Sequence, residues 1–132
     1  EVYKRQPQAS LDTPLPTTPL EPLEALYDAL RAAKLAGTDL SQAALRLTAG
    51  GVRTVVANGQ LAGTSVLTAD EVKELLAQPG VRTYYNSHYE SAYCIYAPNS
   101  YQTAAVWYQD QRSMEAKLQL ARLFGVTAYY ME

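Results

Sequence analysis

The chain has 132 residues, the size of one domain, and its 48% hydrophobic and 18% charged residues are typical of a globular protein. Its 11 basic and 13 acidic residues give a net charge of -2, so it lacks the concentrated positive field of a protein that binds nucleic acid or an anionic membrane. No apolar run approaches the roughly 18 residues that span a bilayer, and no signal peptide is recognisable. The single cysteine, Cys94, excludes an internal disulfide and a thiolate zinc site.

Residues 1–22 are expected to be disordered or a linker. This stretch holds five prolines, a density that excludes a regular helix or a central strand: Pro7, Pro14, Pro16, Pro19 and Pro22. Residues 1–6 resemble the translated adapter read-through of a metagenomic reading frame, with an ordinary basic tail as the alternative. Because the chain stops directly after a strand-like run, residues 23–132 are expected to be an incomplete piece of a larger protein.

The first half of the ordered region is predicted to contain two helices and a strand. Apolar residues at three- and four-residue spacing predict an amphipathic helix over 23–36, with Gly37 as its stop. Asp39 or Ser41 is expected to cap a second short helix that carries Ala44, Leu45 and Leu47 and is ended by the glycines at 50 and 51. The β-branched run 52–57 then predicts a buried strand.

The second half is predicted to alternate strands with helices. Thr68 and Glu71 form a capping box at the start of a helix that ends before Pro79. A strand over 81–85 and a hairpin of 92–97 with 103–108 follow, and Asp110 then caps a helix that ends at Gly125. The last strand is expected over 126–131. This alternation favours parallel α/β pairing, with the hairpin as an antiparallel excursion.

The sequence offers no catalytic residue and no metal site. The acids Asp70, Glu71 and Glu74 complement the dipole of a first helical turn, which is the favoured interpretation of that cluster. His88 is the only histidine, so neither a catalytic triad nor a histidine-rich metal centre can be assembled, and a surface-loop position is expected for it. Cys94 is expected to be a small core residue. No cofactor is predicted.

The tyrosines are the one compositional feature with functional content. Of 13 aromatic residues, 11 lie between Tyr84 and Tyr130. Tyrosines on a sheet can stack on sugar rings and hydrogen-bond their hydroxyls, which favours a carbohydrate groove. The alternative is that aromatic side chains are good strand residues and core fillers.

The stretch from Asp70 to Glu132 carries a more specific pattern. Residues 105–117 read AVWYQDQRSMEAK, and the run GVTAYYM follows at 125–131. A strand ending near a tryptophan, a short acidic cap, Arg-Ser, a lysine four residues after the serine and a glycine before the last strand together resemble the C-terminal end of family-18 glycoside hydrolases. The likeness is nearest to the chitinase-like branch that acts on the spore cortex and peptidoglycan.

The resemblance implies a partial (β/α)8 barrel, its C-terminal portion, with a small α+β insertion that includes the strands near Tyr84 and Tyr93. The parent would hydrolyse glycans containing N-acetylglucosamine, in peptidoglycan or chitin, by the substrate-assisted retaining route. The family's acidic signature, Asp-x-x-Asp-x-Asp-x-Glu, is absent from this chain, so the chain itself is expected to be inactive. Residues 23–66 have no counterpart in the resemblance.

The resemblance also nominates residues for substrate contact. In this family the eighth barrel strand usually carries a tryptophan that floors the sugar subsite, and Tyr129 occupies the matching position. Trp107 and Tyr85 are the further candidates, although packing between helix and barrel is the favoured role for Trp107. Asp110 and the serine three residues on are expected to cap the following helix, and Lys117 is expected to be solvated or ion-paired.

Two other functions stay open at this point. One is a non-catalytic glycan-binding or scaffold α/β domain, which the tyrosine in place of tryptophan at 129 slightly favours. The other is a small α/β domain whose likeness to the family is accidental. If the chain is instead a fragment of a family-18-like hydrolase, its partner is a carbohydrate and its exposed strand edges lead to self-association. The parent then belongs to the cell envelope, the spore or the extracellular space.

Overall fold

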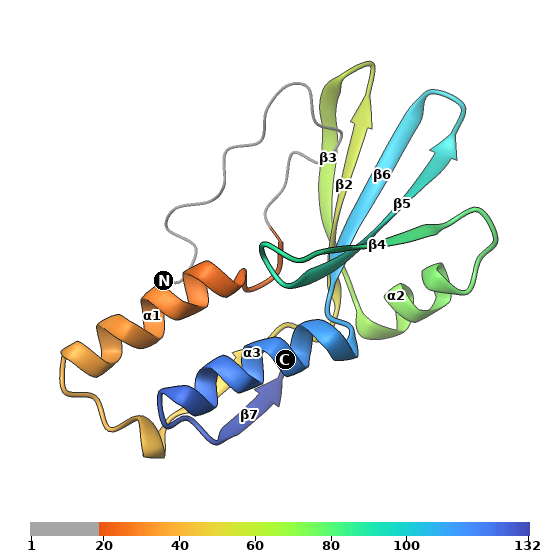
Figure 1. The fold of residues 1–132 in the computed structure, drawn as a ribbon. Helices are drawn as coiled ribbons and strands as arrows, with labels where there is room; N and C mark the ends of the chain where they lie inside the picture. The colour runs from red at the N-terminus through yellow and green to blue at the C-terminus, as the bar shows by residue number, and fades with distance from the viewer. Residues whose placement is uncertain (1–18) are drawn as a thin grey trace.

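The computed structural model describes residues 19–132, which fold into three helices, a short 3-10 turn and seven strands (Figure 1). The helices are α1 (Leu23–Leu35), α2 (Ala69–Leu76) and α3 (Gln111–Leu123), and the 3-10 turn is η1 (Leu40–Gln42). The strands are β1 (Ala44–Leu47), β2 (Gly51–Ala57), β3 (Gln60–Leu67), β4 (Arg82–Asn86), β5 (Ser91–Asn99), β6 (Gln102–Tyr108) and β7 (Ala128–Met131).

Most of the strands form one antiparallel sheet in the order β3-β2-β6-β5-β4. The predicted hairpin of 92–97 with 103–108 is confirmed as β5 and β6. The expected parallel pairing of strand 52–57 is wrong, because β2 runs antiparallel to both β3 and β6. The connection between β2 and β3 is a two-residue turn in which Asn58 and Gly59 both have positive φ, as a hairpin turn of this kind requires.

Strand β3 lies in a stretch for which the pattern predicts no element. It is the edge strand of the sheet, and nearly all of its side chains are exposed. An edge strand with Gly63, Thr64 and Ser65 at its centre has no alternation of apolar and polar residues to reveal it.

A second, two-stranded sheet pairs β1 with β7 in parallel. The second short helix, predicted to carry Leu45 and Leu47, is therefore wrong. Asp39 caps only the 3-10 turn, with its carboxylate accepting from the Ser41 amide at 3.1 Å. The side chains of Leu45 and Leu47 are both buried, and spacing by two is the period of a strand. Strand β1 sits directly before β2, whereas α3 separates the larger sheet from β7 (Figure 1).

Each sheet has its own core. Helices α1 and α3 cover one face of the β1–β7 pair, and that core contains Leu26, Leu30, Leu40, Leu45, Leu47, Ala121 and Val126. Helix α2 covers one face of the larger sheet, where Val72 and Leu75 pack against Cys94 and Val106. The predicted core position of Cys94 is confirmed, and burial raises the pKa of its thiol to about 11.

The predicted helix caps are confirmed. Thr68 accepts from the Glu71 amide at 3.1 Å and the Glu71 carboxylate accepts from the Thr68 amide at 2.8 Å. At the start of α3, Asp110 and Ser113 exchange the equivalent pair of hydrogen bonds. These contacts satisfy amides that have no partner inside a helix.

Residues 1–18 lie outside the described part of the chain, so the linker predicted over 1–22 and the adapter origin of 1–6 stay predictions. Of that stretch the structure describes residues 19–22, and these are buried. Leu20 and Glu21 are each only 7% exposed. The segment that enters α1 therefore packs inside the molecule.

We expect alanine at position 50 to destabilise the chain, because an added Cβ there would overlap the main-chain carbonyl of Leu67. Overpacking of this kind costs about 1–3 kcal/mol. Gly63→Ala is the matched control, since a Cβ at that position meets nothing within 4 Å. Urea unfolding of both variants measures the difference, and equal stabilities for the two would contradict this account.

Candidate functional site

The carboxyl ends of β1 and β7 meet at one edge, because the two strands are parallel. Leu45 and Leu47 point into the helix-covered core, so the alternation of the strand places Arg46 on the opposite face. Register pairs Arg46 with Tyr130 on that same face. We take the carboxyl ends of β1 and β7, with the face that carries Arg46 and Tyr130, as the candidate site and call that face the open face. Active sites of parallel α/β barrels lie at the carboxyl ends of their strands.

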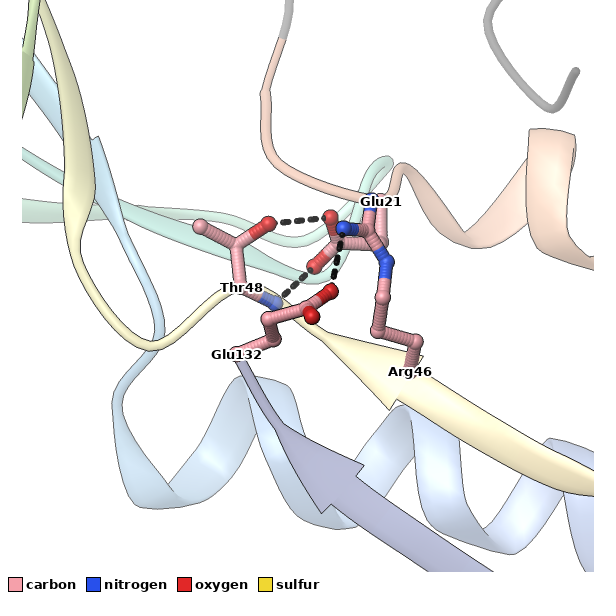
Figure 2. Close-up of polar contacts among 4 residues, drawn as sticks. All are labelled: Glu21, Arg46, Thr48 and Glu132. Atoms are coloured by element: carbon pink, nitrogen blue, oxygen red, sulfur yellow. Dashed lines mark hydrogen bonds and ion pairs between the residues drawn. The ribbon is translucent and has the colours of Figure 1, made fainter.

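Two pairs of polar side chains mark the site (Figure 2). Arg46 donates to the Glu132 carboxylate at 3.0 Å, and this hydrogen bond and charge raise the pKa of the guanidinium. Both side chains are more than half exposed, so the pair contributes little to stability. Beside it, the buried Glu21 carboxylate accepts from both the amide and the hydroxyl of Thr48, at 2.9 and 2.7 Å. Glu21 thus fixes the first residue after β1.

A buried lysine, Lys117, contacts the residue that precedes Glu21. Lys117 is 0% exposed, so the expectation of a solvated or ion-paired side chain is wrong. Its ammonium donates to the Leu20 carbonyl at 2.8 Å, to Gln109 Oε1 at 3.0 Å and to Ser91 Oγ at 3.4 Å. Three acceptors from three separate segments replace the water that burial removes.

Burial lowers the pKa of Lys117 to about 8, because the charged form loses its hydration. The carboxylates of Glu21, Asp110 and Glu90 oppose the shift. The lysine keeps its charge at neutral pH, and the site therefore contains a buried cation whose compensating charges lie on neighbouring segments.

The aromatic residues of the larger sheet form a row across its strands. Register places Trp107 between Val52 and Tyr93, and Tyr93 is paired in turn with Tyr84. The rings of Tyr84 and Tyr93 stack at 5.3 Å between centroids, and those of Tyr93 and Trp107 lie 4.6 Å apart. Trp107 is only 3% exposed and packs beside Tyr93 on the face of the sheet opposite to α2, so its packing role between helix and barrel stays a prediction. Tyr84, at 42%, is the exposed ring of the row.

The structure does not bring the three nominated contact residues together. Tyr85 lies on the α2-covered face of the sheet, opposite to Trp107, where its hydroxyl donates to Glu90 at 2.6 Å and Arg112 stacks over its ring at 3.8 Å. Desolvation, followed by the bond to Glu90, raises the pKa of this phenol strongly. Tyr129 is 47% exposed and pairs with Leu45, so it shares the helix-facing side of the strand pair.

Tyr130 is the residue that the sequence prediction missed. It is 48% exposed, shares the face of Arg46, and lies two positions before Glu132. The alternation of side chains along a strand was the available signal. Once Leu45 and Leu47 define the core side of β1, the residue of β7 that pairs with Arg46 must face the site.

Other kinds of site are not indicated by the described residues. Among residues 19–132, no three His, Cys, Asp or Glu side chains are grouped so that they could hold a metal ion. Within the same range, no helix has the length and apolar character needed to cross a membrane.

The fold superposes on parts of several solved glycoside hydrolases. No family model matches the sequence, and no curated protein matches it either. The spore cortex-lytic enzyme SleL of Bacillus megaterium superposes with a TM-score of 0.74 at 19% identity, over 90% of this chain and 28% of SleL. A chitinase of Chromobacterium violaceum gives 0.71 at 17% identity, over 87% and 35% of the two chains. A family-18 chitinase of Cycas revoluta, solved with (GlcNAc)3, gives 0.65 at 20%, over 77% and 31%.

The chain therefore resembles family-18 glycoside hydrolases in its mixed α/β fold, and spans about a third of the length of those enzymes. The spore cortex-lytic enzymes are among its structural neighbours, in agreement with the branch indicated by the sequence. The described residues do not themselves form a barrel.

Stability should rise with pH between 8 and 9, and Lys117 should be the cause. The unfolded lysine titrates near 10.5 and the folded one near 8, so the unfolded chain binds more protons in that interval. The slope of the unfolding free energy approaches about 1.4 kcal/mol per pH unit. Above pH 9 the raised pKa of the Cys94 thiol acts in the opposite sense.

The measurement is urea unfolding at pH 8 and 9 for the wild type and Lys117→Met. The variant removes the titrating group, so its stability should change less over this interval. Groups common to both proteins cancel in the comparison, and equal slopes would rule out a buried lysine with a lowered pKa.

Proposed function

We propose that this chain is part of a glycoside hydrolase that acts on glycan containing N-acetylglucosamine, in peptidoglycan or chitin. In this proposal β1 and β7 are neighbouring strands of a (β/α)8 barrel. The five-stranded sheet with α2 is an α+β insertion between β1 and the helix that follows it, α3. The observation that carries the proposal is this arrangement, a parallel strand pair joined through an inserted antiparallel sheet, in a fold that superposes on SleL with a TM-score of 0.74.

The catalytic acid would come from outside these 132 residues. The chain has no Asp-x-x-Asp-x-Asp-x-Glu signature, and its open face presents Arg46, Tyr130 and Glu132 in place of two carboxylates on one strand. The parent would use the acetamido group of the substrate as its internal nucleophile. This part of it would supply one end of the sugar-binding cleft, because active sites of such barrels lie at the carboxyl ends of the strands.

The neighbours support two glycans as substrates. SleL is named as a spore cortex-lytic enzyme, and the Cycas revoluta chitinase holds (GlcNAc)3. The oligosaccharide held by the chitinase consists of N-acetylglucosamine, a sugar common to chitin and peptidoglycan, and we propose it as the sugar that this chain contacts. A parent acting on either polymer would work in the cell envelope, in the spore or outside the cell.

The chain alone should bind chitin oligosaccharides weakly through the exposed tyrosines of β7. We expect (GlcNAc)4 to shift NMR signals of residues 128–132, and Tyr130→Ala to weaken the binding about tenfold, the effect of losing one stacked ring and its hydroxyl. Tyr129→Ala should weaken it less, because Tyr129 pairs with Leu45 on the helix-facing side of the strand pair. Tyr101→Ala is the matched control, because Tyr101 is 65% exposed in the distant turn between β5 and β6. Binding that Tyr130→Ala does not weaken would contradict this placement of the site.

The longer gene product should hydrolyse the glycan. We expect the parent to release products ending in N-acetylglucosamine, and a Glu-to-Gln change in its acidic signature to abolish the release. This chain alone should release none. A gene without that glutamate, whose product still binds (GlcNAc)4, would instead support a non-catalytic glycan-binding domain, which the tyrosine at position 129 favours.

The chain on its own should also self-associate. Each strand of the β1–β7 pair has one unpaired edge among the described residues, and Tyr129, Tyr130 and Met131 are exposed. Unpaired edges of this kind recruit strands from other molecules. Sedimentation velocity between about 5 and 200 μM should show a mass that rises with concentration, and a constant monomer mass over that range would argue against it.

A further inference from the structure

Glu21 is an enclosed acid whose hydrogen bonds come from uncharged groups. Its carboxylate accepts from the Thr48 amide, the Thr48 hydroxyl and Gln109 Nε2, at 2.9, 2.7 and 2.8 Å. The guanidinium of Arg46 is close enough to interact with its charge, but bonds to Glu132. The backbone of Glu21 also has φ +37, a conformation that residues other than glycine adopt only when their surroundings hold them there.

Gln109 connects this acid to the buried lysine. Its amide nitrogen donates to Glu21, while its amide oxygen accepts from Lys117 Nζ at 3.0 Å and from Ser113 Oγ at 2.7 Å. The polarity of the amide matches both neighbours: oxygen toward the cation and nitrogen toward the anion. A single side chain at the end of β6 therefore separates two opposite charges that do not touch.

The network joins the two sheets. Lys117 belongs to α3, which packs on the β1–β7 pair, whereas Ser91 and Gln109 lie at the ends of β5 and β6 in the larger sheet. Glu21 completes the link, because it holds Thr48 where β1 gives way to the turn into β2.

We propose that Lys117, Gln109 and Glu21 form a relayed ion pair that fixes the carboxyl end of β1 to the larger sheet, with Gln109 as the positioning residue. The relay needs one negative charge, which can lie at position 21 or at position 109. A carboxylate at 21 acts on Lys117 through the amide of Gln109, whereas a carboxylate at 109 would face the lysine directly. The proposal goes beyond glycan binding and does not depend on it.

A charge exchange tests the relay. Glu21→Gln should raise the unfolding equilibrium constant about 10- to 100-fold, the effect of losing hydrogen bonds to a buried charge. Gln109→Glu should also raise it, because two carboxylates would then lie side by side. The double variant Glu21→Gln/Gln109→Glu restores one negative charge and should return to within about threefold of the wild type. Effects that simply multiply would overturn the proposal.

Glu24→Gln is the matched control for the exchange. Glu24 is an acid three residues away whose side chain is 70% exposed and pairs only with the equally exposed His88. It should change the unfolding constant less than about threefold.

A second measurement, the 15N signal of the Lys117 ammonium, can be made on the wild-type protein. The ammonium of Lys117 should give a slowly exchanging 15N signal at neutral pH in the wild type, unlike surface lysines. Where the variants fold, Glu21→Gln should shift that signal although its side chain does not touch Lys117, and Glu24→Gln should leave it in place. An ammonium that exchanges as fast as those of exposed lysines would overturn the relay even if no variant folds.

Discussion

The buried ammonium of Lys117 holds the larger sheet, helix α3 and the segment before α1 together. The Lys117 ammonium lies fully inside the protein, where an uncompensated charge would be very costly. Its three acceptors come from the segment before α1, from β5 and from Gln109, the residue that follows β6. None of these segments can move independently without leaving a donor unsatisfied, so the larger sheet, the helices and the entry segment keep one relative arrangement. The two hydrophobic cores are separate, and this polar junction is what lies between them.

The sequence was sufficient for the elements whose signals are local. Both capping boxes, the three helices and the β5–β6 hairpin depend on residues close together in the chain, and all are present as expected. Pairing partners were not predictable in the same way, because β2 carries the same β-branched residues whether its neighbours are parallel or antiparallel. Strand β1 was mistaken for a helix since four residues after a good cap are too few to separate a period of 3.6 from a period of 2.

The errors at the site have a common physical cause. In α3 the apolar side chains of Met114 and Leu118, and that of the C-cap residue Phe124, are partly buried against the core. The fully buried positions of this helix are Ser113, Lys117 and Ala121, spaced by four along one helical face. Apolar periodicity does not reveal this row of buried positions, because two of its three members, Ser113 and Lys117, are polar. Likewise, Tyr129 and Tyr130 are equivalent in composition, and only the register with β1 decides which of them shares the face of Arg46. The fold class was therefore easier to predict than the identity of the site residues.

The entrance and exit of the larger sheet lie next to each other. Gly51, the first residue of β2, is paired with Tyr108, the last residue of β6, so the chain leaves the strand pair and returns to it within the width of one antiparallel ladder. A loop of a few residues between Thr48 and Asp110 would close the same gap. The sheet is thus a module that could be replaced without rethreading the strands on either side, but not simply removed, because Ser91 and Gln109 supply acceptors to Lys117. An engineer could graft a different sheet at this point, provided that the new module again offers acceptors to the buried lysine.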